Sequence, residues 1–385
     1  MDLNPTEIGE RLRISRENAH VTQADAAAAI GVARTTIVAI EKGQRRIRTD
    51  ELSQLVKIYG TTINSLLRNE AIHVDLVPRF RKLADSKDED ALMASQLVSD
   101  LARAEVELEN LLGVRRTHDY PPERPILPGD VRAQAELNAM ELRERLGLGS
   151  RPVPDIVTLL EMDLGVRVYV RKIPSRISGL FVFQEALGPC MLLNASHPRT
   201  RRNQSAAHEL GHFISTRNNA EIQYLNENIR SREERYADAF AIAFLTPDRP
   251  VRQTFLEVTA GSNQLTRRHV IVLANIFGVS REAMVRRLED LGLTKRGTWD
   301  WFMKNGGITD DQERQVLGDL QIPDPARVEA NRPMTLRLQL LAAEAYRQEL
   351  LSESQLARLL RLDRIELREL FEGIESEASG TDVFS

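Results

Sequence analysis

The chain has 385 residues with 42% hydrophobic, 28% charged and 5% aromatic content, enough for about two or three domains with hydrophobic cores. Its net charge of −4 excludes DNA binding through bulk positive charge, so any nucleic-acid contact would come from one basic face. A single cysteine excludes intrachain disulfides and cysteine zinc clusters, and the lack of a signal peptide or a long apolar run favours a cytoplasmic protein without membrane insertion.

Residues 1–70 have the order of a helix-turn-helix domain. Apolar spacing predicts a helix over residues 5–18, Thr22 can cap a second helix, and Gly31-Val32 can form the turn. A third helix is predicted over residues 33–42. Two further helices complete a five-helix domain, one through Leu52, Leu55 and Val56 and one through Ile63, Leu66 and Leu67.

Three stretches of this region resemble the XRE, or lambda-repressor-like, DNA-binding family: Q-A-D-A-A from Gln23, G-V-A-R-T-T-I from Gly31 and I-E-K-G from Ile40. In such domains the second helix of the pair enters the major groove with its first residues against the base edges. The resemblance therefore implies a set of base readers, namely Arg34, Thr35 and Thr36. It also implies candidates for phosphate or flanking contacts, namely Gln23, Lys42, Arg45 and Arg46.

The charge of this domain is nearly balanced. Ten Lys/Arg against nine Asp/Glu give residues 1–70 a net charge of +1, so the footprint on operator DNA would be local and concentrated in residues 42–48. Two alternatives stay open: the domain binds a protein partner, or it has lost DNA binding. XRE domains usually read palindromes as dimers, which implies a homodimer.

Residues 71–128 are expected to connect this domain to the next one. Residues 71–116 are polar and helical with an apolar stripe, which predicts a connector or dimerising helix or, equally, a helix packed on its neighbours. Residues 118–128 predict a linker, because they contain Pro121, Pro122, Pro125 and Pro128.

The next domain, residues 129–295, begins with an amphipathic helix over residues 129–149 and continues with segments that predict a small sheet. Three strands are expected, over residues 166–170, 178–183 and 190–194. Cys190 fits packing within a strand. An edge strand of this sheet could hold an extended substrate by β-augmentation.

The run His208-Glu209-Leu210-Gly211-His212 is the H-E-x-x-H arrangement that turns one face of a helix into a metal site. Positions four apart on a helix point the same way, so both imidazoles can reach one ion. Glu209 can then act as the general base that deprotonates an attacking water. Gly211 is a poor helix residue, which suggests that something approaches the backbone there. This arrangement predicts peptide hydrolysis.

A catalytic zinc site needs a third protein ligand. A second helical pattern, over residues 231–245, carries Glu234 and Asp238 four positions apart. We therefore expect Glu234 to bind the metal while Asp238 accepts a hydrogen bond from a ligand histidine. Glu233 is the alternative ligand, and an exposed acidic helix start is the alternative without a metal.

At these residues the chain resembles a known family. Residues 201–213, the E-x-x-A-D-x-F-A pattern around Glu234 and the L-T-P run from Leu245 are similar to the ImmA/IrrE metallopeptidases, which often have L-M-P at the last position. The resemblance implies a zincin-like core whose substrates are transcriptional repressors, cut at a defined site in stress response, phage or mobile-element excision, or defence. Zinc suits two histidines and one carboxylate, and manganese is the alternative ion.

Three further side chains are candidates for contacts with the substrate or the transition state. Asn194 ends the third strand, Tyr236 lies beside Glu234, and His269 lies in a later helix, where a structural role is the alternative. That later region predicts helices over residues 266–277 and 281–291, in a helix-turn-helix order that completes the peptidase unit.

Residues 296–385 are expected to form a C-terminal helical accessory domain, for partner or substrate recognition or for packing alone, with a disordered tail over residues 375–385. The predicted fold class is mainly α with a small β-sheet, that is, α+β. The predicted function is a DNA-binding transcriptional regulator with metallo-endopeptidase activity that cleaves a repressor protein or itself. The alternative is a non-enzymatic helix-turn-helix repressor whose peptidase-like domain senses a ligand or a partner.

Overall fold

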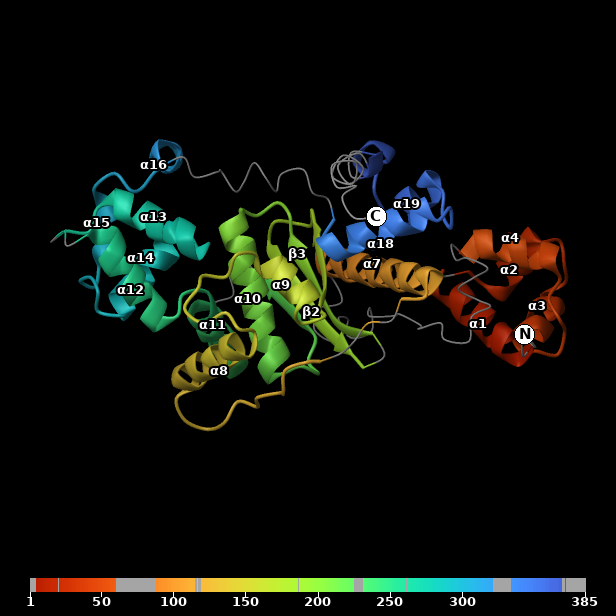
Figure 1. Ribbon diagram of the computed structural model, residues 1–385. Coiled ribbons are helices and arrows are strands. Elements are labelled where there is room, and N and C mark those ends of the chain that lie inside the picture. Colours follow the sequence, from red (N-terminus) through yellow and green to blue (C-terminus); the bar gives the residue numbers. More distant parts are fainter. Residues whose placement is uncertain are drawn as a thin grey trace, which may run out of the picture. The chain divides into compact units, whose positions relative to one another are not determined.

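The structure, a computed structural model, describes most of the chain. The described residues are 5–19, 21–59, 88–114, 116, 119–185, 187–224, 231–260, 262, 264–320, 334–368 and 371. They are mainly helical with one four-stranded sheet, which confirms the predicted α+β class (Figure 1). The predicted fifth helix of the first domain and the predicted tail lie outside the described residues.

The chain divides into two compact units, residues 1–75 together with 105–115 and residues 76–104 together with 116–385. The first unit contains the helix-turn-helix. Its described helices are α1 (Pro5–Asn18), α2 (Gln23–Ala29), α3 (Arg34–Glu41) and α4 (Thr49–Tyr59). Thr22 and Asp25 form a capping box that starts α2, and Gly31 takes the positive φ of 68° that the turn into α3 requires. The buried faces of the four helices share one core, which includes Leu12, Ala26, Ile37, Ile40 and Leu55.

The second unit is built around a mixed sheet in the order β1-β3-β2-β4. The strands are β1 (Arg167–Arg171), β2 (Ile177–Gln184), β3 (Gly188–Asn194) and β4 (Glu221–Tyr224). β1 runs parallel to β3, and β2 runs antiparallel to β3 and to β4. All three predicted strands are present. The edge strand β4 was not predicted, because its polar-apolar alternation extends over only four residues and so carries too little signal.

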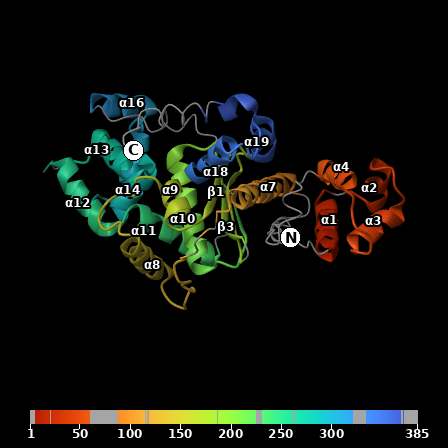
Figure 2. The same ribbon diagram turned by 45° about the vertical axis from the view of Figure 1, so that its right-hand side comes forward.

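Four helices pack with this sheet around one extensive hydrophobic core. They are α8 (Val131–Arg145), α9 (Ile156–Met162), α10 (Arg199–Ser215) and α11 (Arg232–Leu245). Phe181 and Met191 of the sheet contribute to this core together with Phe213 of α10 and Phe240 of α11. Figure 2 shows α10 beside the sheet from a second direction. The core therefore fixes α10 and α11 against each other and against the sheet.

Five helices follow α11 along the chain. They are α12 (Asp248–Thr259), α13 (Arg267–Phe277), α14 (Arg281–Asp290), α15 (Thr298–Lys304) and α16 (Asp310–Asp319), so the helices predicted over residues 266–277 and 281–291 are confirmed. One hydrophobic cluster joins Ile271 and Val285 to Phe302 and Leu317. Residues before and after the domain boundary expected at residue 295 therefore pack in the same hydrophobic cluster.

The remaining described helices are α7 (Glu89–Leu112), α18 (Leu336–Arg347) and α19 (Glu353–Leu360). The hydroxyl of Thr335 donates to the carbonyl oxygen of Val168 in β1, 3.0 Å away, so residues at the start of α18 lie against the sheet edge. Val98 and Leu101 of α7 are fully buried within the chain. This burial favours the packed-helix interpretation of α7 over a dimerising surface. Within the described residues no helix combines the length and the apolar character needed to cross a bilayer.

Candidate functional site

The candidate metal ligands meet where α10 and α11 cross. His208 and His212 lie one turn apart on α10, and their Nε2 atoms are 3.2 Å from each other. Glu234, in the first turn of α11, places one carboxylate oxygen 3.3 Å from Nε2 of His208 and the other 3.2 Å from Nε2 of His212. Among the described residues these three form a group whose ligand atoms all lie within 4.8 Å of one another, and Glu233 is not part of it.

Each histidine is held from its other ring nitrogen. Nδ1 of His208 lies 3.1 Å from a carboxylate oxygen of Asp238, and Nδ1 of His212 lies 3.3 Å from the hydroxyl of Thr216. A hydrogen on Nδ1 satisfies both contacts and leaves the Nε2 lone pairs directed at the centre. Asp238 thus stands where the sequence predicted a supporting carboxylate. Thr216 was missed, although its position four residues after His212 on the same helix face was a usable signal.

The donor set fits a divalent cation. Two imidazole lone pairs and a carboxylate at mutual distances of 3.2–3.3 Å repel one another unless a proton or a cation lies between them. Burial acts to lower the pKa of His208, but hydrogen bonds to Asp238 and Glu234 outweigh it and raise that pKa to about 10. The same carboxylate of Glu234 has its pKa lowered by the two histidines in spite of its burial. The site therefore favours positive charge at its centre.

Glu209 is the unusual member of this group of side chains. It is completely buried, and among the described residues neither of its carboxylate oxygens has a hydrogen-bond partner. Burial raises the pKa of Glu209 to about 7, and the adjacent His208 only partly opposes the rise. A Cβ added to Gly179 of β2 would lie 3.4 Å from Oε1 of Glu209, so the carboxylate rests against the backbone of this strand. A buried, unpaired carboxylate beside three converging ligands is equipped to accept a proton.

The three further candidates occupy structural positions. The side-chain amide of Asn194 donates to the carbonyl oxygens of Ile173, Pro174 and Ile177 and thereby holds the loop between β1 and β2. Tyr236 is two residues beyond Glu234 and so points away from it at ~100° per residue. Its buried hydroxyl accepts a hydrogen bond from Asn138 of α8, 2.7 Å away.

His269 caps a helix. Its Nδ1 accepts a hydrogen bond from the backbone N–H of Thr266 in the capping box of α13. These contacts give Asn194, Tyr236 and His269 structural work, and among the described residues none of the three belongs to the metal-ligand group. Their predicted contacts with the substrate or the transition state stay predictions.

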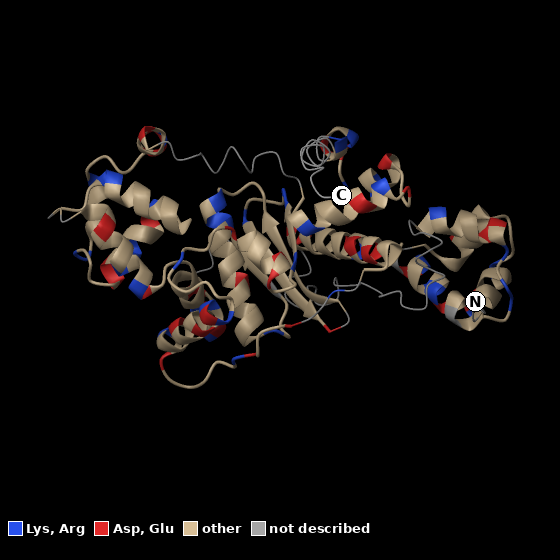
Figure 3. Cartoon of the chain, in the orientation of Figure 1, with Lys and Arg blue, Asp and Glu red and all other residues tan. Residues whose placement is uncertain are grey.

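The helix-turn-helix presents some of its candidate residues to solvent and uses others internally. Arg34, Thr35 and Lys42 are exposed, and Thr36 is half-buried. The guanidinium of Arg45 makes two hydrogen bonds to the carboxylate of Glu51, at 2.9 and 2.8 Å. Figure 3 shows both blue and red segments on the described helices of this unit, in keeping with its nearly balanced charge.

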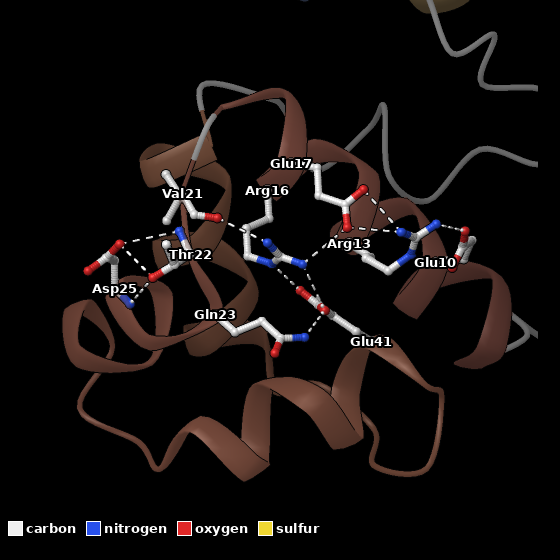
Figure 4. A network of polar contacts seen from close by, with 9 residues as sticks. All are labelled: Glu10, Arg13, Arg16, Glu17, Val21, Thr22, Gln23, Asp25 and Glu41. Carbon is white, nitrogen blue, oxygen red and sulfur yellow. Dashed lines mark hydrogen bonds and ion pairs between the residues drawn. The ribbon is translucent and has the colours of Figure 1, made fainter.

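A buried ion pair that the sequence did not reveal ties the helix-turn-helix together (Figure 4). Nε of Arg16 on α1 donates to the carboxylate of Glu41 on α3 at 2.6 Å, and the amide of Gln23 on α2 donates to the same carboxylate at 2.9 Å. Arg16 also donates to the carbonyl oxygen of Val21 at 3.0 Å. Three helices are thus joined at one carboxylate, and the side chain of Gln23 is held at the start of α2.

Comparisons with known proteins find one family in each of the two units. The model of a helix-turn-helix domain matches residues 7–67, and the model of the IrrE N-terminal-like domain matches residues 161–289. No curated protein matches the chain. The crystal structure of ComR from Streptococcus suis matches 98% of this chain and 96% of that chain at 11% identity, with a TM-score of 0.17. A likeness at this TM-score supports no argument about fold or function. The chain therefore carries an XRE-like helix-turn-helix domain at its N-terminus and an IrrE/ImmA-like domain of the M78 peptidase family over residues 161–289.

Proposed function

We propose that this protein is a DNA-binding regulator with metallo-endopeptidase activity that cleaves a repressor protein, or itself, to control gene expression in stress-response, phage or mobile-element, or defence contexts. The observation that carries the proposal is Glu209. A purely structural metal site needs three or four ligands but no additional buried carboxylate without partners. Such a carboxylate costs stability, which a chemical role explains.

The chemistry follows from the roles of the named side chains. A divalent ion held by His208, His212 and Glu234 would supply Lewis acidity for water and for a peptide carbonyl, with zinc proposed and manganese as the alternative. Glu209 accepts the proton of the attacking water and returns it to the leaving amine. Asp238 and Thr216 hold the imidazoles with Nε2 facing inward.

The DNA-binding part of the proposal uses the exposed start of α3. Arg34, Thr35 and Thr36 would face base edges of an operator, and Lys42 a phosphate. Gln23 and Arg45 remain proposed contacts, from positions that Glu41 and Glu51 already fix. A homodimer on a palindromic operator in the cytoplasm completes the proposal.

The contacts of residues 119–130 favour a separate repressor over self-cleavage in the proline-rich segment. The backbone N–H of Arg124 donates to the carbonyl oxygen of Ile214 at 2.7 Å, and Arg217 donates to that of Pro121 at 2.5 Å. Gln134 makes a donor and an acceptor contact with Pro125 and Leu127, at 2.8 and 3.1 Å. Cleavage here would first require these hydrogen bonds to break.

The test compares wild type with Glu209→Gln on candidate repressors encoded nearby, with metal content and operator binding measured on the same samples. Glutamine keeps the size of the side chain but cannot take a proton, so cleavage should fall by about 100- to 10,000-fold while metal and operator binding stay unchanged. Glu233→Gln, one residue from the ligand Glu234, is the matched control and should cleave normally. Unchanged cleavage by Glu209→Gln would show that Glu209 is not the general base. Intact repressors with a metal-loaded wild type would favour the non-enzymatic repressor.

A further inference from the structure

The two ligand-bearing helices touch at a single glycine. A Cβ built on Gly211 of α10 would lie 2.9 Å from Cα, 3.3 Å from Cβ and 3.4 Å from the carbonyl oxygen of Ala237 on α11. The nearest of these atoms belongs to the backbone, so a flexible side chain cannot move aside to make room. With any larger residue at position 211, the two helices could not keep their present separation.

The contact sits in the same turns as the ligands. Gly211 lies three residues after His208 and one before His212, and Ala237 lies three residues after Glu234 and one before Asp238. Residues three apart share a helix face. The closest point of the two backbones is therefore flanked on both helices by the side chains that form the metal centre.

The contacts between α10 and α11 that form the metal centre lie on either side of this close approach. Glu234 reaches the two histidines at 3.2 and 3.3 Å, and Asp238 reaches His208 at 3.1 Å. Ordinary van der Waals contact would require the 2.9 Å approach to widen to at least 3.4 Å. Metal–ligand distances tolerate changes of only ~0.2 Å. A separation of the helices by this amount is thus larger than the centre can absorb without rearrangement.

We infer that Gly211 is a positioning residue for the metal: the absence of its Cβ sets the separation of α10 and α11 at which donors from both helices reach one ion. The inference rests on the proposed metal centre. It also explains why a poor helix former stands in the middle of the 17-residue helix α10.

The experiment measures zinc affinity, by competition with a chromophoric chelator, and thermal stability of the metal-free full-length protein. In Gly211→Ala the affinity should fall by about tenfold or more, the size of effect that loss of ligand orientation produces. Gly318→Ala is the matched control, because Gly318 is helical and a Cβ there meets nothing within 4 Å. This control should keep wild-type affinity and equal or exceed wild-type stability.

Ala237→Gly separates positioning from stability. It weakens the helix propensity of α11 but leaves the close approach open, so the melting temperature should fall while zinc affinity stays within about threefold of wild type. A merely structural role for the crossing predicts instead that zinc affinity follows stability across the variants. Wild-type zinc affinity in Gly211→Ala overturns the inference.

Two further outcomes are decisive. The double variant Gly211→Ala with Ala237→Gly removes the 3.3 Å contact but keeps the 2.9 Å approach to the backbone, so it relieves only part of the strain. It is measured as well, in case Gly211→Ala by itself does not fold, and should bind zinc more weakly than Ala237→Gly alone. Equal affinity of these two proteins overturns the inference. If wild type itself binds neither zinc nor manganese, the proposed metal centre fails, and the inference fails with it.

Discussion

Glu41 of the first unit and Glu209 of the second unit are both buried, but their surroundings differ. The side chain of Glu41 in the helix-turn-helix is 4% exposed and receives hydrogen bonds from Arg16 and Gln23. Glu209 in the second unit is 0% exposed, and neither of its oxygens has a hydrogen-bond partner in the part of the chain that the structure describes. The paired carboxylate joins three helices, and the unpaired one lies beside the metal-ligand group.

The difference in pairing distinguishes a structural carboxylate from one that can take part in proton transfer. A buried carboxylate that has a counter-ion and whose oxygens accept hydrogen bonds fixes the geometry of its neighbours and stays ionised. A buried carboxylate without partners is destabilising but can take up a proton near neutral pH. Substitutions at the two glutamates should therefore differ in sign, which gives the comparison its strongest test.

The largest effect on stability is expected at Glu41. Glu41→Gln removes the buried charge that pairs with Arg16 and leaves it only the half-exposed Glu17, 3.5 Å away. Breaking a buried pair from one side costs up to ~3–5 kcal/mol. Calorimetry of the full-length protein should show the transition of the N-terminal unit at a lower temperature. Glu10→Gln is the control, since the side chains of Glu10 and its partner Arg13 are 51% and 41% exposed and such pairs contribute less than ~1 kcal/mol. Equal effects of the two changes would contradict the comparison.

Glu209→Gln should act in the opposite direction in the metal-free protein. The folded-state pKa of Glu209 is raised to about 7 from an ordinary 4.5, so the metal-free fold loses stability as the pH rises between these values. Glutamine carries no such charge, and the variant should exceed wild type by up to ~3 kcal/mol at pH 8 and by little at pH 4. Thermal unfolding of chelator-treated samples at the two pH values measures this gain. A variant less stable than wild type at pH 8 would refute the interpretation of an unpaired carboxylate.

A smaller effect is expected at Asp238, which acts on the metal through His208. Asp238→Asn removes the charge that holds the imidazole and should weaken zinc binding by about 10- to 100-fold. Chelator competition gives the affinity, and Glu233→Gln serves as the control with an unchanged value. If both variants bind zinc like wild type, Asp238 does not orient the ligand.

The smallest effect should come from Arg45, which the structure pairs with Glu51. Arg45→Met should lower the stability at pH 7 only slightly, because this ion pair is partly exposed. The hydrogen bond from Arg45 lowers the pKa of Glu51, so this contribution exists above the ordinary carboxylate pKa and is lost as the pH falls through the lowered value. Calorimetry at pH 7 and at pH 3 tests this. In operator binding Arg34→Ala should be weaker than wild type by about tenfold and Arg45→Met by much less, and the reverse order would make Arg45 the principal DNA contact.

The sequence predicted the features that depend on spacing along one helix. His208 and His212 had to share a face because they are four apart, and the same reasoning placed Asp238 near the ligands once Glu234 was chosen. The helices of the first unit were predictable from turn residues such as Gly31 and from capping by Thr22. These signals are local, so they survive without knowledge of the tertiary fold.

Features that depend on direction or on distant pairing were not predictable in this way. Tyr236 lies close to the ligand Glu234 in sequence, but its hydroxyl faces α8. The side-chain amide of Asn194 donates its hydrogen bonds to the loop between β1 and β2. The ion pair of Arg16 and Glu41 joins residues 25 positions apart, and the sequence around neither residue predicts it. The edge strand β4 exists because β2 offers it a partner.

The sequence by itself determined which residues could serve: two histidines at helical spacing, a glutamate beside them, an acidic helix downstream and a helix-turn-helix at the start. Only the tertiary structure decided the distances at which Glu234 meets the two histidines, and that Glu209 has no hydrogen-bond partner among the described residues. The physical reason is that helix periodicity is a property of one segment, whereas the distance between two helices depends on the residues packed between them. At this crossing those residues are Gly211 and Ala237.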